Sequence, residues 1–73
     1  MEDKILYLIK QRVGEDVSVT NDSEFFNDLG LSSLDMAIII LTLEDELGLK
    51  INVMDLVGIK TVGSLIERIK KNT

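Results

Sequence analysis

A chain of 73 residues is long enough for one small domain, and its formal charge of −5 makes that domain acidic. It contains neither cysteine nor histidine, which excludes a disulfide framework, a thiolate metal site, a thiol nucleophile and the commonest general base. We therefore expect a single domain over residues 1–73 that is not an enzyme.

The acidic residues are concentrated in the middle of the sequence. Residues 21–56 hold eight acids and one base, whereas the remaining residues hold five acids and seven bases. A negative region of this kind repels nucleic acid and attracts basic patches on protein partners. The charge pattern thus predicts protein partners and no nucleic acid.

The sequence does not predict membrane insertion. Its first four residues include three charged ones and do not resemble a signal peptide. The longest strongly apolar run, residues 36–43, is interrupted by Thr42 and is too short to span a bilayer. We expect a cytoplasmic protein.

The first predicted element is an amphipathic helix over residues 2–13. Acids at its start and bases at its end suit the helix dipole, and Gly14 is a natural stop. The residues at helical spacing that we expect to face the core are Ile5, Leu6, Leu8, Ile9 and Val13.

Residues 15–32 show no sustained periodicity. This is a long connection for a compact domain, so we expect an ordered loop held by its apolar residues, with Phe25 and Phe26 as the largest. Ser23 could cap a short helical turn within it.

The second predicted helix covers residues 33–47. Ser32 or Ser33 supplies an N-cap hydroxyl, Asp35 lies in the first turn, and Gly48 provides a left-handed stop. The predicted core face consists of Met36, Ile39, Ile40, Leu43 and Leu47.

A second apolar line runs along the same helix. Leu34, Ala37 and Leu41 follow i, i+3, i+7 spacing, and Ile38 widens the stripe. Such a surface is either a partner-binding site or part of a broad core, and periodicity alone does not decide between them.

The remaining residues predict a loop held by Leu49 and Ile51, a short helical turn over residues 53–57, and a last helix over residues 62–71 capped by Thr61. Gly63 weakens that helix by about 1 kcal/mol relative to alanine. The whole is all-α: a small four-helix bundle with three main helices, a short third helix and a long ordered loop after the first. The last helix should turn inward Val62, Leu65, Ile66 and Ile69.

A serine stands where the second helix begins, in the run Asp28-Leu29-Gly30-Leu31-Ser32-Ser33-Leu34-Asp35. A hydroxyl at a helix N-terminus is exposed and lies in the positive end of the dipole, where an attached phosphodiester would be stabilised. By physical argument alone, a serine in this place is more often a simple cap than a site of modification.

This run resembles the motif Asp-Leu-Gly-x-Asp-Ser-Leu-Asp of the acyl carrier proteins. The resemblance continues through the phenylalanines before the motif, the run Leu43-Glu44-Asp45-Glu46-Leu47-Gly48, Ile51 and the Thr61-Val62 start of the last helix. It covers essentially the whole chain.

The resemblance implies that Ser33 receives 4′-phosphopantetheine from coenzyme A through a separate phosphopantetheinyl transferase that uses Mg²⁺. The arm then holds the acyl group as a thioester, and a fatty cargo would enter between the second helix and its neighbours. Such a carrier is expected to be a monomer, because several acyl-handling enzymes with basic docking patches must reach it. The partner-binding residues implied are the acids Asp35, Glu44, Asp45 and Glu46 and the apolar Leu34, Ala37, Ile38 and Leu41.

Two departures from the family pattern favour a specialised carrier of a polyketide-like, peptide-like or lipid-modifying pathway over the general fatty-acid carrier. Ser32 stands where the family usually has aspartate, and Ile38 stands where many fatty-acid carriers have glutamate.

Two alternatives remain open. An aminoacyl or peptidyl carrier would use the same serine, but its recognition helix is generally less acidic than the Glu44-Asp45-Glu46 run. An unmodified helical adaptor would bind a partner through Leu34, Ile38 and Leu41. A calcium site around residues 21–24 lacks the spacing of an EF-hand loop.

Overall fold

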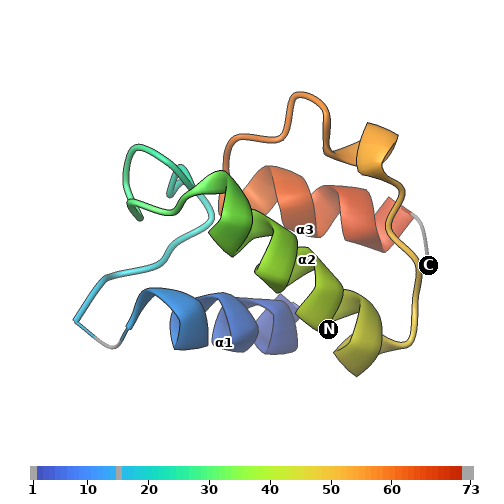
Figure 1. Ribbon diagram of the computed structural model, residues 1–73. Coiled ribbons are helices and arrows are strands. Elements are labelled where there is room, and N and C mark those ends of the chain that lie inside the picture. The colour runs from blue at the N-terminus through green and yellow to red at the C-terminus, as the bar shows by residue number, and fades with distance from the viewer. Residues whose placement is uncertain (1, 15, 72–73) are drawn as a thin grey trace.

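The computed structural model describes residues 2–14 and 16–71 of the chain. It contains the helices α1 (Glu2–Val13), α2 (Ser33–Leu47) and α3 (Val62–Lys71), with a four-residue 3₁₀ helix, η1 (Val53–Leu56), between α2 and α3 (Figure 1). The three main helices predicted from the sequence are confirmed. Glu15, where the predicted loop begins, lies outside the described residues.

The expected count of four bundle helices is not confirmed. The segment predicted as a short third helix forms the single 3₁₀ turn η1, in which the side chain of Asn52 accepts a hydrogen bond from the Met54 N–H at 2.9 Å. The core is enclosed by three α-helices and the two long connections between them. Apart from an isolated antiparallel bridge between Glu24 and Thr61, the described residues form no β-structure.

The core is built from one face of each helix. Ile5 and Ile9 of α1 are buried, and so are the four residues of α3 predicted to turn inward. On α2 the predicted core face is confirmed, with Ile39, Ile40 and Leu43 buried and with Met36 and Leu47 at its two ends half-buried and packed against the core. The buried apolar residues described are Ile5, Ile9, Phe25, Leu29, Leu31, Ile39, Ile40, Leu43, Ile51, Val62, Leu65, Ile66 and Ile69.

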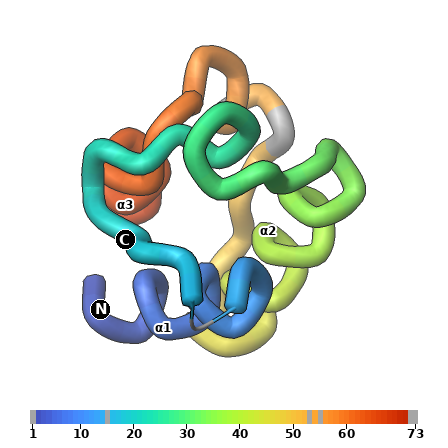
Figure 2. Tube along the Cα trace, turned by 90° about the vertical axis from the view of Figure 1, so that its left-hand side faces the viewer, coloured from blue at the N-terminus to red at the C-terminus, as the bar shows by residue number. Residues whose placement is uncertain are grey.

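The loop over residues 16–32 runs from the end of α1 past α3 to the start of α2 (Figure 2). Backbone hydrogen bonds hold it against the first turn of α3. Phe25 N–H donates to the Lys60 carbonyl at 3.0 Å, while the N–H groups of Val62 and Gly63 donate to the carbonyls of Ser23 and Asn21 at 3.0 and 2.8 Å. The loop therefore supplies acceptors that the helix itself cannot offer to its first N–H groups.

The two phenylalanines of this loop have different environments. Phe25 is 1% exposed, as predicted, but the prediction for Phe26 was wrong, because its side chain is 53% exposed. The backbone of Phe25 is held by its hydrogen bond to Lys60, and of the two adjacent side chains only that of Phe25 belongs to the core.

Ser23 does not cap a helical turn as proposed from the sequence. It is buried, and its Oγ accepts a hydrogen bond from the Thr20 N–H at 3.0 Å. The caps of the main helices are as predicted. Gly48 adopts φ +64° and donates its N–H to the Glu44 carbonyl, and the Thr61 Oγ1 accepts from the Ser64 N–H at 3.2 Å.

Ion pairs at the surface join α1 to the other helices. Lys4 Nζ lies 3.6 Å from Glu46 Oε1 of α2, and Lys70 Nζ of α3 lies 3.5 Å from Glu2 Oε1. Exposed pairs of this kind stabilise a fold only slightly. None of the described helices is long and apolar enough to cross a membrane.

Candidate functional site

Ser33 is the first residue of α2 and its side chain is exposed. The preceding residue, Ser32, has extended backbone (φ −96°, ψ 172°) and is the N-cap. Its Oγ accepts a hydrogen bond from the Asp35 N–H at 3.2 Å, so the capping role falls on Ser32. The hydroxyl of Ser33 is thus not needed as the cap and stands at the positive end of a rigid helix.

Asp35 completes a capping box. Its Oδ2 accepts hydrogen bonds from the Ser32 N–H and from the Ser32 Oγ, each at 3.0 Å. The pKa of the Asp35 carboxyl is held below its ordinary value. The largest cause is the hydrogen bond from the Ser32 backbone, followed by the bond from the Ser32 hydroxyl and by the Arg12 guanidinium. Asp35 is therefore a carboxylate at neutral pH, next to the proposed attachment residue.

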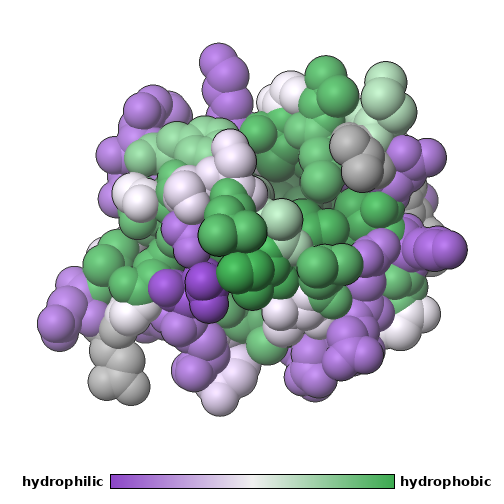
Figure 3. Space-filling view, viewed as in Figure 1, coloured by the Kyte–Doolittle hydropathy of each residue, from purple (hydrophilic) through white to green (hydrophobic). Residues whose placement is uncertain are grey.

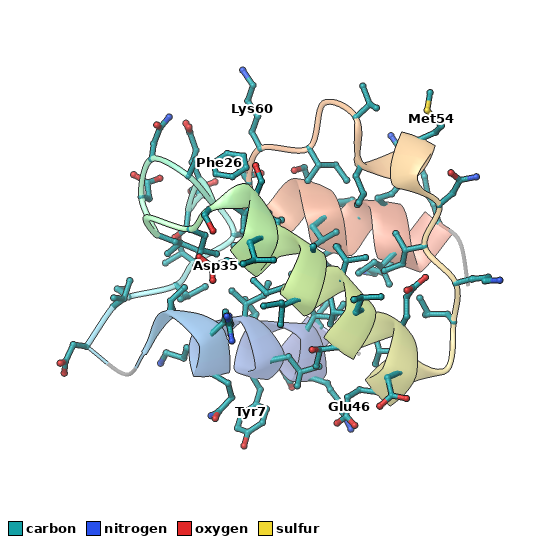
Figure 4. The ribbon with its side chains drawn as sticks, viewed as in Figure 1. Tyr7, Phe26, Asp35, Glu46, Met54 and Lys60 are labelled. Atoms are coloured by element: carbon teal, nitrogen blue, oxygen red, sulfur yellow. The ribbon has the colours of Figure 1, made fainter. Side chains whose placement is uncertain are left out.

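Arg12 of α1 lies against the other oxygen of this carboxylate. Its Nε and Nη2 are 3.3 and 3.2 Å from Asp35 Oδ1. Figure 4 shows Asp35 at the start of α2, on the side of the helix toward α1. The ion pair joins the last turn of α1 to the first turn of α2, 23 residues further along the chain.

An open apolar groove of about 500 Å³ begins at Ser33 and follows α2. Figure 3 shows the apolar side chains gathered over the middle of this helix and beside it. Among its described lining residues only Ser33 and Glu44 are polar. The lining consists of Phe26, Ser33, Met36, Ala37, Ile40, Leu41, Glu44, Ile51, Leu56 and Ile59.

The second apolar line of α2 is surface and not core. Leu34 is 70% exposed, Leu41 is 65% exposed, and Ala37 between them is also exposed. Ile38 is half-buried and lines a smaller cleft between α1 and α2, together with Leu8 and Arg12. The choice that periodicity left open is thereby decided in favour of an uncovered surface.

Three of the four acids expected to meet partners are held by contacts inside the chain. Asp35 is held as described above, Glu44 Oε2 accepts the Ile51 N–H at 2.8 Å, and Glu46 pairs with Lys4. Of these four acids, Asp45 is the one that is exposed and has no polar partner among the described residues. The acidic run at the end of α2 is thus less available than its sequence indicates.

The site has the features that a covalently attached phosphodiester arm requires. Ser33 offers an exposed hydroxyl at a helix N-terminus, which stabilises negative charge, and the groove beside it offers apolar surface. Across the described residues, no three or more acids converge in a group that could hold a metal ion.

Sequence reasoning missed two parts of this site. The sequence predicts Arg12 only as one of the two bases, with Lys10, that suit the end of α1, and Phe26 only as an apolar residue that holds the loop. No local pattern indicates either role, because each depends on a segment distant in sequence.

Comparisons with known proteins agree with this geometry. A family model described as a phosphopantetheine attachment site matches residues 3–69. An acyl carrier protein of Clostridium perfringens is 43% identical over 75 residues, covering all of this chain and 97% of the relative. One from Thermotoga maritima is 36% identical over 69 residues, covering 93% of this chain and 85% of the relative.

The fold has a match among solved structures as well. A structure from Mycobacterium tuberculosis, assigned as an acyl carrier protein, superposes with a TM-score of 0.87 at 31% identity. The match covers 96% of this chain and 95% of the other.

Proposed function

We propose that this chain carries acyl groups as thioesters on an arm joined to Ser33. The proposal starts from its family, because the chain belongs to the acyl carrier proteins, which have a phosphopantetheine attachment site. Members of this family are carriers and not enzymes, and their cofactor is covalent 4′-phosphopantetheine. When bound, that group supplies the thiol that the cysteine-free chain lacks. Ser33 presents the attachment oxygen, and Ser32 and Asp35 keep the first turn of α2 in place around it.

The main support for this proposal is the difference between the two adjacent serines. Ser32 forms the helix cap, whereas Ser33 is exposed and lines the apolar groove. A modifying enzyme could reach Ser33 without breaking a hydrogen bond of the described structure.

The test is intact-protein mass after incubation with coenzyme A, Mg²⁺ and a promiscuous phosphopantetheinyl transferase. We expect one phosphopantetheine on the wild-type chain and none on Ser33→Ala. Ser32→Ala should still be modified, although loss of the cap destabilises it by about 1 kcal/mol. Ser18→Ala, at an exposed loop position, is a matched control for serine loss without loss of the cap.

Two outcomes would place the arm on another residue. One is phosphopantetheine on Ser33→Ala, and the other is loss of modification only in Ser32→Ala while its helix content stays intact. A folded wild-type chain that several transferases leave unmodified would favour the unmodified adaptor, with its partner on the Leu34–Leu41 surface.

For the pathway we propose a specialised carrier rather than the general carrier of fatty acid biosynthesis. The support is the departures at Ser32 and Ile38 together with the internal contacts of Asp35, Glu44 and Glu46, which leave fewer free acids on α2. The same scarcity keeps an aminoacyl or peptidyl carrier as the second candidate.

A loading assay distinguishes these two candidates. The phosphopantetheine-bearing protein is offered to a malonyl transferase with malonyl-coenzyme A and, separately, to amino-acid-activating enzymes with ATP and amino acids. Malonyl loading alone supports the acyl carrier, and aminoacyl loading alone supports the second candidate.

We further propose that an aliphatic cargo lies in the groove. Its apolar lining and its position beside Ser33 support this. Loading with an octanoyl group should shift the methyl resonances of Ile40, Leu41 and Ile59, and Ala37→Phe, which fills the groove, should abolish those shifts. Equal shifts in both proteins would place the cargo outside the groove.

A further inference from the structure

We infer that Arg12 is a specificity-determining residue for partners that dock at the Ser33 end of α2, because it occupies the carboxylate that such partners would bind. This inference rests on the proposed carrier function. Arg12 acts through Asp35 and takes no direct part in the attachment of the arm.

Both oxygens of the Asp35 carboxylate are engaged. Oδ2 accepts two hydrogen bonds from Ser32, and Oδ1 faces the Nε and Nη2 of Arg12 at 3.3 and 3.2 Å. The Ser32 contacts belong to the helix cap and are local. A basic side chain of a partner that seeks Asp35 must therefore displace Arg12.

Arg12 also changes the charge that a partner meets. The residue before Ser33 is the neutral Ser32, and the nearest acid after it, Asp35, is paired with a cation. The first turn of α2 consequently carries no unpaired acid, while Asp45 near the other end is exposed and unpaired in the described structure. A partner with its basic residues at the Ser33 end is disfavoured relative to one that docks mainly at the far end or through the apolar side chains.

The size of the effect follows from exposure. The side chains of Arg12 and Asp35 are 41% and 30% exposed, and pairs of this kind are weak. Removal of Arg12 should therefore change the efficiency of docking by roughly two- to fivefold and not by orders of magnitude.

Lys10 provides a matched control. It lies on the same helix, carries the same charge and is exposed, but forms no ion pair in the described residues. Arg12→Gln and Lys10→Gln alter the net charge equally, so only the first tests the release of Asp35.

The experiment measures the initial rate of phosphopantetheine transfer by intact mass at varied concentrations of the carrier. We expect Arg12→Gln to lower KM roughly two- to fivefold with kcat unchanged, and Lys10→Gln to leave KM unchanged or only slightly lowered, because both changes make the carrier more acidic. In the double variant with Asp35→Asn, the lower KM of Arg12→Gln should be lost. Arg12→Lys should restore much of the wild-type KM. Added salt should reduce the difference in KM between Arg12→Gln and the wild type. Circular dichroism establishes that each variant is folded.

Equal KM values for Arg12→Gln and Lys10→Gln would overturn the inference, and so would a gain that survives Asp35→Asn. A fall in kcat/KM for Arg12→Gln would show that Arg12 itself contacts the partner, which also overturns it. Failure of the wild-type chain to be modified by any transferase would instead reject the proposed function, and that outcome is read from the wild type alone.

Discussion

The two long connections of this domain differ in how they meet the helices. Residues 16–32 bury Phe25 and exchange backbone hydrogen bonds with the start of α3. Residues 49–61 bury Ile51, but they leave Met54 and Val57 exposed and border the open groove with Leu56 and Ile59. The first connection therefore holds the turn that leads into Ser33, and we expect the second, which forms one wall of the groove, to be the more adaptable of the two.

This difference suits a carrier, whose attachment residue must be presented in one geometry to many enzymes while its cargo varies. A fixed approach to Ser33, the proposed attachment residue, would serve the first need, and the apolar groove proposed for the cargo would serve the second. Four experiments test this difference between the two connections.

The largest effect is expected at Phe25. Phe25→Ala should lower the free energy of unfolding by about 3–5 kcal/mol, because it leaves a cavity where the loop, α3 and the core meet. Phe26→Ala should change it by less than about 0.5 kcal/mol, since its side chain is exposed. Urea unfolding gives the free energy of unfolding of both variants. Equal losses would contradict the claim that Phe25 lies in the core and Phe26 on the surface.

Gly63→Ala tests the contact between the loop and α3. Helix propensity alone predicts a gain, but a Cβ at this position would lie 2.9 Å from the Asn21 carbonyl oxygen, which also accepts the Gly63 N–H. We expect a loss of about 1–3 kcal/mol from this overpacking. Glu67→Ala, exposed on the same helix, serves as the control and should be near neutral. A stabilised Gly63→Ala would mean that the loop is not held at this point.

Hydrogen exchange of the native protein compares the connections directly. The amides of Phe25, Val62 and Gly63 bond across the two segments at 2.8–3.0 Å, whereas those of Val57 and Ile59 bond only within their own turn at 3.3 and 3.2 Å. We expect the second group to exchange at least about tenfold faster, through local opening that leaves the core intact. Equal protection in both groups would remove the basis for an adaptable wall.

The smallest effect concerns the Asp35 carboxylate, where the first connection enters α2. Because its pKa is lowered in the folded chain, Asp35 contributes stability that is present above the ordinary aspartate pKa of about 3.9 and is lost as the pH falls through the lower folded value. Asp35→Asn should therefore unfold at a lower urea concentration than wild type at pH 6, and this difference should narrow as the pH is lowered below the ordinary aspartate pKa. A difference that is independent of pH would show that the carboxylate charge has no part in the cap.

Local sequence patterns were enough to predict the three main helices and the caps at Gly48 and Thr61, because helix periodicity, N-cap hydroxyls and left-handed glycines act within one or two turns. They left the cap of α2 open between Ser32 and Ser33, and Ser33 became the candidate attachment residue only through the resemblance to the acyl carrier motif. Three features became visible only in the folded chain. These are which of two adjacent phenylalanines is buried, which acids of α2 are paired, and that a side chain at position 63 would collide with the loop. Each of these depends on segments far apart in the chain, such as Arg12 with Asp35 or Asn21 with Gly63, and their approach is fixed only when the helices pack.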